Sequence, residues 1–206
     1  MLLELAIQFF KNAIPNRSTV RFAWWGAEEI GLFGSRHYVR TIKTNATAFN
    51  NIALYINFDM MGSPNFVAQV HDSYIVSVPV TDVIMDASYQ VQRLLETFFQ
   101  KEELPYQLDP MAGGSDYLPF IEAGIPSNGL ATGAGLLKTE QERLEFGGFA
   151  NAPHDPCYHQ YCDTVENVSR EALRQCSQSA GTALEALAVM PNLREYLYTP
   201  QKPATR

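Results

Sequence analysis

The sequence predicts an α/β fold with a largely parallel central sheet, because β-prone apolar runs alternate with amphipathic helical patterns. The 206 residues suffice for one compact domain and are too few for two ordinary ones. The expected strands, rich in β-branched and aromatic residues, are Thr19–Trp25, Asn51–Phe58 and Ile125–Leu130. In such a fold ligands bind beyond the carboxyl ends of the strands, which is where functional residues are expected.

Two helices are expected in the first part of the chain. An apolar face without a preceding cap indicates a helix that is already under way over Met1–Phe10. Gly26 ends the first strand, and a second helix is expected over Leu32–Ile42. A helix without a start signal is typical of an N-terminally truncated chain.

Three more helices are expected further along the sequence. Thr81 is a suitable N-cap for a long helix, Ser115–Ala123 is a short helix, and Ser169 caps the last one. The Gly-rich residues 131–156 are expected to form a functional loop. Residues 199–206 are expected to be a flexible tail.

The composition excludes several classes of function. A net charge of −7 and the lack of a basic stripe argue against a nucleic-acid partner. No apolar run approaches the ~20 residues of a membrane helix, and no signal-peptide pattern is present. The sequons at Asn16, Asn45 and Asn167 are candidate glycosylation sites and favour a secreted or vacuolar location.

Acidic residues follow two of the expected strands. Glu28 and Glu29 come just after the first strand and Asp59 directly after the second, so all three fall at the sheet edge where sites form. The simpler interpretations are that the glutamates favour a helix N-terminus and that Asp59 is a turn residue. Asp116 likewise has two interpretations. It could be a supporting or substrate-contacting carboxylate, or it could be a residue in the first turn of a helix.

His159 lies between Cys157 and Cys162, which are close enough in sequence to form a small disulfide loop. So small a loop removes little unfolded-state entropy, and its main effect would be to orient the residues inside it. A structural zinc site made of the two cysteines with His154 and His159 is the alternative, but the spacing is crowded for one tetrahedral ion. Cys176 is left over and is expected to be a buried free thiol.

These groups would make a coherent hydrolytic site if they converge. A two-metal site uses carboxylate and imidazole ligands around ions ~3.5–4 Å apart. Of two adjacent glutamates, one can bind metal while the other stays free to take a proton from water. A phenol such as Tyr158 could then stabilise the oxyanion of the tetrahedral intermediate.

Several motifs together resemble peptidase family M28 of zinc peptidases, and most closely its secreted or vacuolar aminopeptidases of the fungal aminopeptidase Y type. The likeness runs in order from Leu2 to the final helix. The motifs that carry it are FAWWGAEEIGLFGS at 22–35, NFDMMG at 57–62, GSDY at 114–117 and DPCYHQ at 155–160. The resemblance implies a three-layer α/β/α sandwich with a mixed sheet, forming a peptidase catalytic domain over residues 1–198.

The resemblance also implies a role for each matching residue. Glu28 would be the general base, and Tyr158 would assist the oxyanion. Glu29 and His159 would bind one zinc ion, and Asp59 would bind the other. The implied reaction removes the N-terminal residue from a peptide substrate that has a free N-terminus.

The chain departs from the family pattern near its start. The pattern includes a further His and a bridging Asp upstream of the Glu28–Glu29 pair, and neither has a match in this sequence. The Cys157–Cys162 disulfide, by contrast, is expected of such relatives. With three ligands spread over two zinc positions, we predict weak zinc binding and little or no activity for the chain alone.

Two other functions remain as alternatives. A non-catalytic M28-like domain that only binds partners would not need all five matching site residues, so their joint presence speaks against it. A glutaminyl cyclase-like acyltransferase shares the fold and uses a single zinc ion. The adjacent glutamates and the setting of His159 fit the aminopeptidase better.

Overall fold

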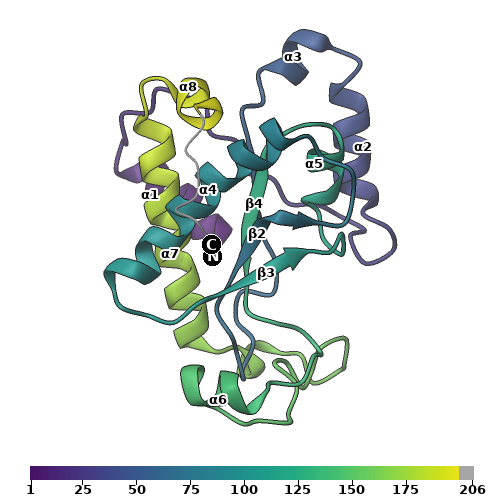
Figure 1. Ribbon diagram of the computed structural model, residues 1–206, viewed down its shortest axis with the longest axis vertical. Coiled ribbons are helices and arrows are strands. Elements are labelled where there is room, and N and C mark those ends of the chain that lie inside the picture. Colours follow the sequence, from purple (N-terminus) through teal and green to yellow (C-terminus); the bar gives the residue numbers. More distant parts are fainter. Residues whose placement is uncertain (200–206) are drawn as a thin grey trace.

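A four-stranded sheet with the strand order β1-β4-β2-β3 runs through the centre of the computed structural model, which describes residues 1–199 (Figure 1). The strands are β1 (Tyr55–Phe58), β2 (Gln69–Val76), β3 (Gln107–Met111) and β4 (Ser127–Ala131). β1 is parallel to β4 and β2 is parallel to β3, whereas β2 and β4 are antiparallel. The expected α/β fold with a mixed, largely parallel sheet is confirmed.

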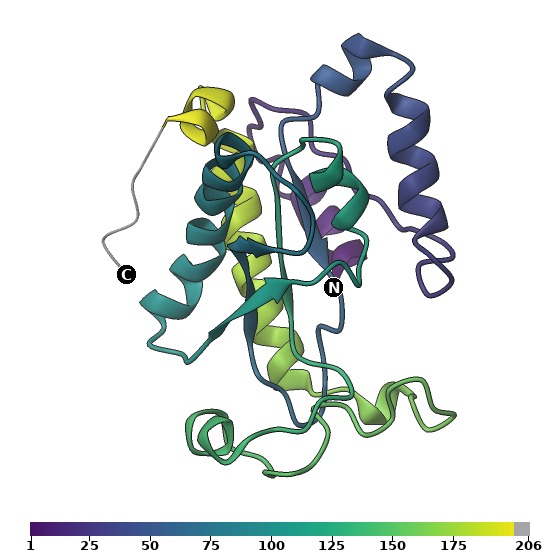
Figure 2. The ribbon, with the colours of Figure 1, turned by 45° about the vertical axis from the view of Figure 1, so that its right-hand side comes forward.

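Helices lie on both sides of this sheet (Figures 1 and 2). α4 packs against β2, β4, α7 and α8, and α2 packs against α3 and α5. The helices are α1 (Leu2–Lys11), α2 (Phe33–Ile42), α3 (Ala46–Asn50), α4 (Asp82–Lys101), α5 (Leu118–Glu122), α6 (Glu140–Phe146), α7 (Arg170–Val189) and α8 (Leu193–Tyr198), with a 3-10 helix at Val165–Asn167. Within residues 1–199, no helix is long and apolar enough to cross a membrane.

The main hydrophobic core lies where α4 and α7 pack together and against the sheet. Val91, Leu95 and Phe99 of α4 are fully buried, and each such side chain contributes roughly 1.5–3 kcal/mol of hydrophobic free energy. α7 begins after Ser169, whose side chain caps the helix as expected. Cys176 is a buried free thiol, also as expected, and burial raises its pKa to about 12.

The prediction of a strand at Thr19–Trp25 is wrong. The described chain has no strand there, and no backbone hydrogen bond joins this segment to β1. Side chains hold it instead, because the Trp25 ring lies 5.1 Å from the Tyr38 ring and 5.8 Å from the Phe120 ring. The β-propensity of the segment reflects the fit of its side chains to a half-buried surface, and that fit does not supply a strand partner.

Two strands of the sheet, β2 and β3, are not predicted from the sequence. β2 carries buried polar residues, among them His71 and Asp72, which interrupt its apolar pattern. β3 contains Pro110, which lacks a backbone donor and is tolerated because β3 is an edge strand. The other two expected strands are present, but β1 covers only the second half of the range expected for it.

The loop expected over residues 131–156 is partly helical. α6 begins after Thr139, which forms a capping box with Glu142. Of the tail expected over 199–206, only Thr199 belongs to the described residues, and 200–206 lie outside them.

Candidate active site

Asp59 lies where β1 ends, at the edge where the parallel strands β1 and β4 present their carboxyl ends. Its Oδ2 accepts a hydrogen bond of 2.7 Å from the Ser115 hydroxyl. Met60 has a φ of 51°, so the chain leaves the strand in a turn. Asp59 is therefore both a turn residue and a positioned carboxylate, and its two interpretations are compatible.

Glu28 and Glu29 lie in a tight turn that precedes α2. The turn is closed by backbone hydrogen bonds from Leu32 N to Glu28 O, 2.8 Å, and from Gly34 N to Gly26 O, 3.0 Å. Gly34 is required there, because a Cβ atom would lie 2.5 Å from Gly26 O. The first turn of α2 holds no acidic residue, so the interpretation of the glutamates as helix N-terminal acids is wrong.

Glu28 sits among other carboxylates. Burial, and then the charges of neighbouring Asp and Glu side chains, raise the pKa of Glu28 from 4.5 to about 6. The nearby His159 opposes this rise. A carboxyl group with a pKa near the working pH is suited to take a proton and give it back. The raised pKa of Glu28 meets this requirement of a general base.

His159 reaches the same cluster from a distant part of the chain. Its Nε2 lies 3.0 Å from Oε1 of Glu29, and its ring stacks on that of Tyr158 with the centroids 3.8 Å apart. The disulfide Cys157–Cys162 closes the loop that carries both rings. With its cysteines paired in this way, the alternative structural zinc site is excluded in this structure.

Tyr158 and Asp116 complete the cluster. Burial and the nearby carboxylates raise the pKa of Tyr158, so its phenol stays protonated at neutral pH and can donate a hydrogen bond. Asp116 precedes α5 rather than lying within it. Burial raises the pKa of Asp116, and a hydrogen bond with Ser35 partly opposes this rise. Its Oδ1 is buried and accepts no hydrogen bond within the described chain.

The donors of this cluster fit zinc in their chemistry but not in their number. Glu29 and His159 supply a carboxylate oxygen and an imidazole nitrogen, both common zinc donors, at a separation that two ligands of one ion can have. Among residues 1–199, however, no group of three or more His, Cys, Asp or Glu side chains could hold a metal ion. The described chain therefore offers two donors that suit one zinc ion but no complete metal group.

Sequence reasoning misses two residues that support Asp59. Ser115 donates to Asp59, and Asn57 donates in turn to Ser115 over 2.8 Å. The signals that could have pointed to them are the GSDY motif for Ser115 and strand alternation for Asn57, because residues two apart share one face of a strand.

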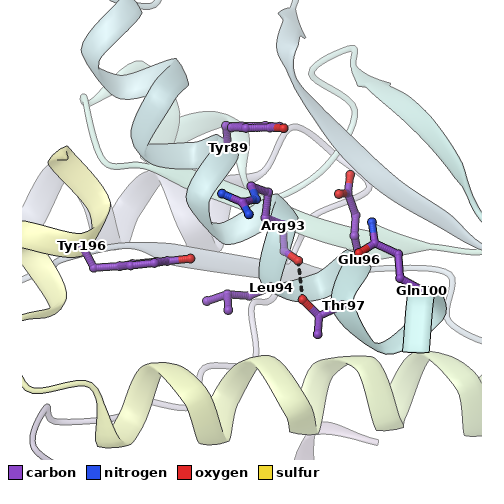
Figure 3. Close-up of a pocket in the computed structure, with 7 residues that line it drawn as sticks. All are labelled: Tyr89, Arg93, Leu94, Glu96, Thr97, Gln100 and Tyr196. Carbon is purple, nitrogen blue, oxygen red and sulfur yellow. Dashed lines mark hydrogen bonds between the residues drawn. The ribbon is translucent and has the colours of Figure 1, made fainter. Parts of the chain in front are cut away.

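A cavity of about 390 Å³ lies away from this cluster, between α4 and α8 (Figure 3). None of the cluster's side chains lines it. Its lining residues are Tyr89, Arg93, Leu94, Glu96, Thr97, Gln100 and Tyr196. The cavity and the acidic cluster are therefore separate features of the molecule.

A sandwich that gathers carboxylates and an imidazole at one end of its sheet is a hydrolase-like α/β domain. Residues 1–184 match peptidase family M28, and the chain belongs to this family. It is 37% identical over 177 residues to leucine aminopeptidase 2 of Trichophyton rubrum and 39% identical over 171 residues to an aminopeptidase of Pseudomonas aeruginosa. These matches cover 82% and 83% of this chain but only 34% and 31% of the relatives, so the chain spans about a third of their length.

Solved structures agree with this assignment. BSAP, a zinc aminopeptidase from Bacillus subtilis, is 25% identical with a TM-score of 0.65, covering 91% of this chain and 40% of that one. An aminopeptidase from Aneurinibacillus sp. strain AM-1 is 23% identical with a TM-score of 0.62, covering 91% of this chain and 37% of that one. The second likeness supports the fold alone.

Proposed function

We propose that the chain contributes the proton-transfer residue and part of the zinc ligands of an aminopeptidase that removes N-terminal residues from peptides. The observation that carries this proposal is the 3.0 Å contact between His159 Nε2 and Glu29 Oε1, beside a Glu28 whose pKa is about 6. Membership of family M28 and the aminopeptidase names of the relatives support it. When bound, zinc supplies a Lewis acid that polarises the scissile carbonyl group.

Each side chain of the cluster has a distinct task in this proposal. Glu29 and His159 hold one zinc ion, and Asp59 holds the second. Glu28 takes a proton from the attacking water on its carboxylate and passes it to the leaving amine. The Tyr158 hydroxyl donates a hydrogen bond to the oxyanion that forms at the scissile carbonyl.

Peptides with a free N-terminus suit the charge of this site. Several carboxylates lie together around Glu28, and their combined negative potential attracts the α-ammonium group of a substrate. Asp116 adds to this potential from a buried position, because its charge is among those that raise the pKa of Glu28. Ammonium binding at this cluster would hold the first peptide bond against Glu28.

We also propose a secreted or vacuolar location. The Cys157–Cys162 disulfide and the solvent-exposed sequon residues Asn16 and Asn45 support it. Asn167 is the weakest glycosylation candidate, because it is partly buried and its Nδ2 donates to Oδ1 of Asp155 over 2.8 Å. A glycan on that nitrogen would disturb this contact.

The test is a hydrolysis assay on the product of the complete reading frame that contains this chain. We expect zinc-dependent release of the N-terminal residue from a leucine-initiated peptide, and a loss of at least ~100-fold in kcat in the Glu28→Gln variant. Release at an unchanged rate in that variant would refute the role of Glu28. Absence of release at any zinc concentration would refute the aminopeptidase assignment.

A peptide-binding domain without hydrolytic activity is the second candidate. The observation that favours it is the lack of a three-ligand metal group within residues 1–199. The same assay separates the two functions, because a binding domain would retain peptides without shortening them.

A further inference from the structure

Four hydrogen bonds, one buried and three partly buried, join Trp25 to Asp59. The indole Nε1 of Trp25 donates to the Tyr55 hydroxyl over 3.0 Å, and that hydroxyl donates to Asn57 Oδ1 over 2.8 Å. Asn57 Nδ2 donates to Ser115 Oγ over 2.8 Å, and Ser115 Oγ donates to Asp59 Oδ2 over 2.7 Å. We call this series the Trp25–Asp59 chain.

The chemistry of its members allows only one direction for this chain. An indole N–H can only donate, so the Tyr55 oxygen must accept it and turn its own proton toward Asn57. The Asn57 amide is thereby fixed with its oxygen toward Tyr55 and its nitrogen toward Ser115. Ser115 accepts from Asn57 and gives its single hydroxyl proton to Asp59. Every link therefore fixes the orientation of the next.

The Trp25–Asp59 chain is also held rigidly by its surroundings. The Tyr55 ring stacks on Phe120 with the centroids 3.9 Å apart and the planes 1° from parallel. Asn57 is buried in the sheet. A hydrogen-bond network in a buried setting is stronger than the same network in water, because water does not compete for its partners.

The two ends of the Trp25–Asp59 chain belong to the two segments that carry the candidate carboxylates. Trp25 precedes Glu28 closely in sequence, on a segment without ladder hydrogen bonds to β1. Asp59 directly follows β1. Side-chain hydrogen bonds thus provide a link between these segments that backbone pairing does not provide.

We propose that Trp25, Tyr55 and Asn57 are positioning residues that fix the Asp59 carboxylate relative to Glu28 and Glu29. This inference rests on the proposed function, because the purpose of the fixed geometry is to present Asp59 to a zinc ion. None of the three contacts substrate. Ser115 is the residue that bonds to Asp59, and groups that bond directly to a metal ligand typically contribute ~10–100-fold to metal affinity. Trp25, Tyr55 and Asn57 act through Ser115.

The first experiment compares zinc affinity in two variants of the protein, measured by competition with a chromophoric chelator. Tyr55→Phe removes the hydroxyl in the middle of the Trp25–Asp59 chain and keeps the ring on Phe120. Tyr38→Phe is the matched control, because Tyr38 packs against the same Trp25 and Phe120 rings but takes no part in the Trp25–Asp59 chain. We expect at least ~10-fold weaker zinc binding in Tyr55→Phe and a change below twofold in Tyr38→Phe. Equal affinities in the two variants would overturn the proposal.

The second experiment follows the indole N–H signals by NMR in zinc-free protein, so it does not depend on the proposed function. Asp59→Asn removes the charge at the Asp59 end of the Trp25–Asp59 chain. We expect the Trp25 indole proton to shift and that of the exposed Trp24 to stay in place. An unmoved Trp25 signal would overturn the coupling. If the unmodified chain binds no zinc, which counts against the proposed function, this signal alone decides the inference.

Discussion

Nε2 of His159 lies 3.0 Å from Oε1 of Glu29, although Glu29 lies in a tight turn near the start of the chain and His159 lies in a disulfide loop near its end. Both side chains are largely exposed to solvent. An exposed polar contact of this kind contributes little to stability, at most ~1 kcal/mol. The contact therefore adds little to the stability of the fold.

The raised pKa of Glu28 predicts that this residue destabilises the zinc-free protein at neutral pH. Its pKa is about 6 in the folded chain against 4.5 for the free side chain, so the folded state binds more protons between these values. The stabilising contribution of protonated Glu28 is complete below pH 4.5 and is lost as the pH rises through 6. Above that window, ionised Glu28 costs about 1–2 kcal/mol.

We therefore expect Glu28→Gln to raise the free energy of unfolding by about 1 kcal/mol at pH 8 and to have a smaller effect at pH 4.5. Urea denaturation in the presence of a chelator measures both values. Glu145→Gln, which changes a solvent-exposed glutamate of α6, is the control and should change neither. A Glu28→Gln variant that is less stable than the parent at pH 8 would contradict the pKa assignment.

The disulfide is expected to matter more for metal binding than for stability. Replacing Cys157 and Cys162 by Ser opens a loop of sequence separation 5, and so short a loop accounts for only ~2 kcal/mol of stability. The same change frees the backbone that orients His159, so zinc affinity should fall at least ~10-fold. Cys176→Ala, in the core, should lower stability and leave zinc affinity unchanged. Equal zinc affinity with and without the disulfide would contradict its orienting role.

Two glycines with similar backbone angles provide a test of the packing of the 131–156 segment. Gly133 has a φ of 86°, and a Cβ atom there would lie 2.4 Å from Nδ1 of the buried His154. Gly124 has a φ of 82° with nothing within 4 Å of the same position. Gly124→Ala should cost about 1–2 kcal/mol through backbone strain alone.

Gly133→Ala should cost about 2–4 kcal/mol, because the clash with His154 adds to the same strain. Thermal or urea unfolding of both variants measures the difference. Similar losses in the two variants would show that His154 moves aside freely, and that this segment is less tightly packed than the structure indicates.

The sequence predicts the parts of this molecule that rest on local patterns. β1, β4, α2, α4 and α7 follow from apolar periodicity and caps, with errors mainly at their ends. β2 is missed because its buried positions are polar, and Thr19–Trp25 is mistaken for a strand because its side chains suit one. Backbone pairing depends on a partner elsewhere in the chain, which a local pattern does not contain.

The candidate site shows the same division. Glu28, Glu29, Asp59 and His159 are found because they stand in ordered motifs, and the structure brings them together. The Ser115–Asp59 and Asn57–Ser115 contacts join positions 56 and 58 residues apart. Such contacts arise only when β1 and the segment that precedes α5 are folded against each other, so neither could be predicted from spacing.

The central claim, that this cluster is part of a zinc site, is tested most directly by locating the metal. Crystals of the chain soaked in zinc and measured at the zinc absorption edge would show where the ion binds. We predict an anomalous peak between Glu29 Oε1 and His159 Nε2, and a second peak of lower occupancy beside Asp59. Zinc bound only at other residues, or no zinc at the Glu29–His159 pair, would contradict the account.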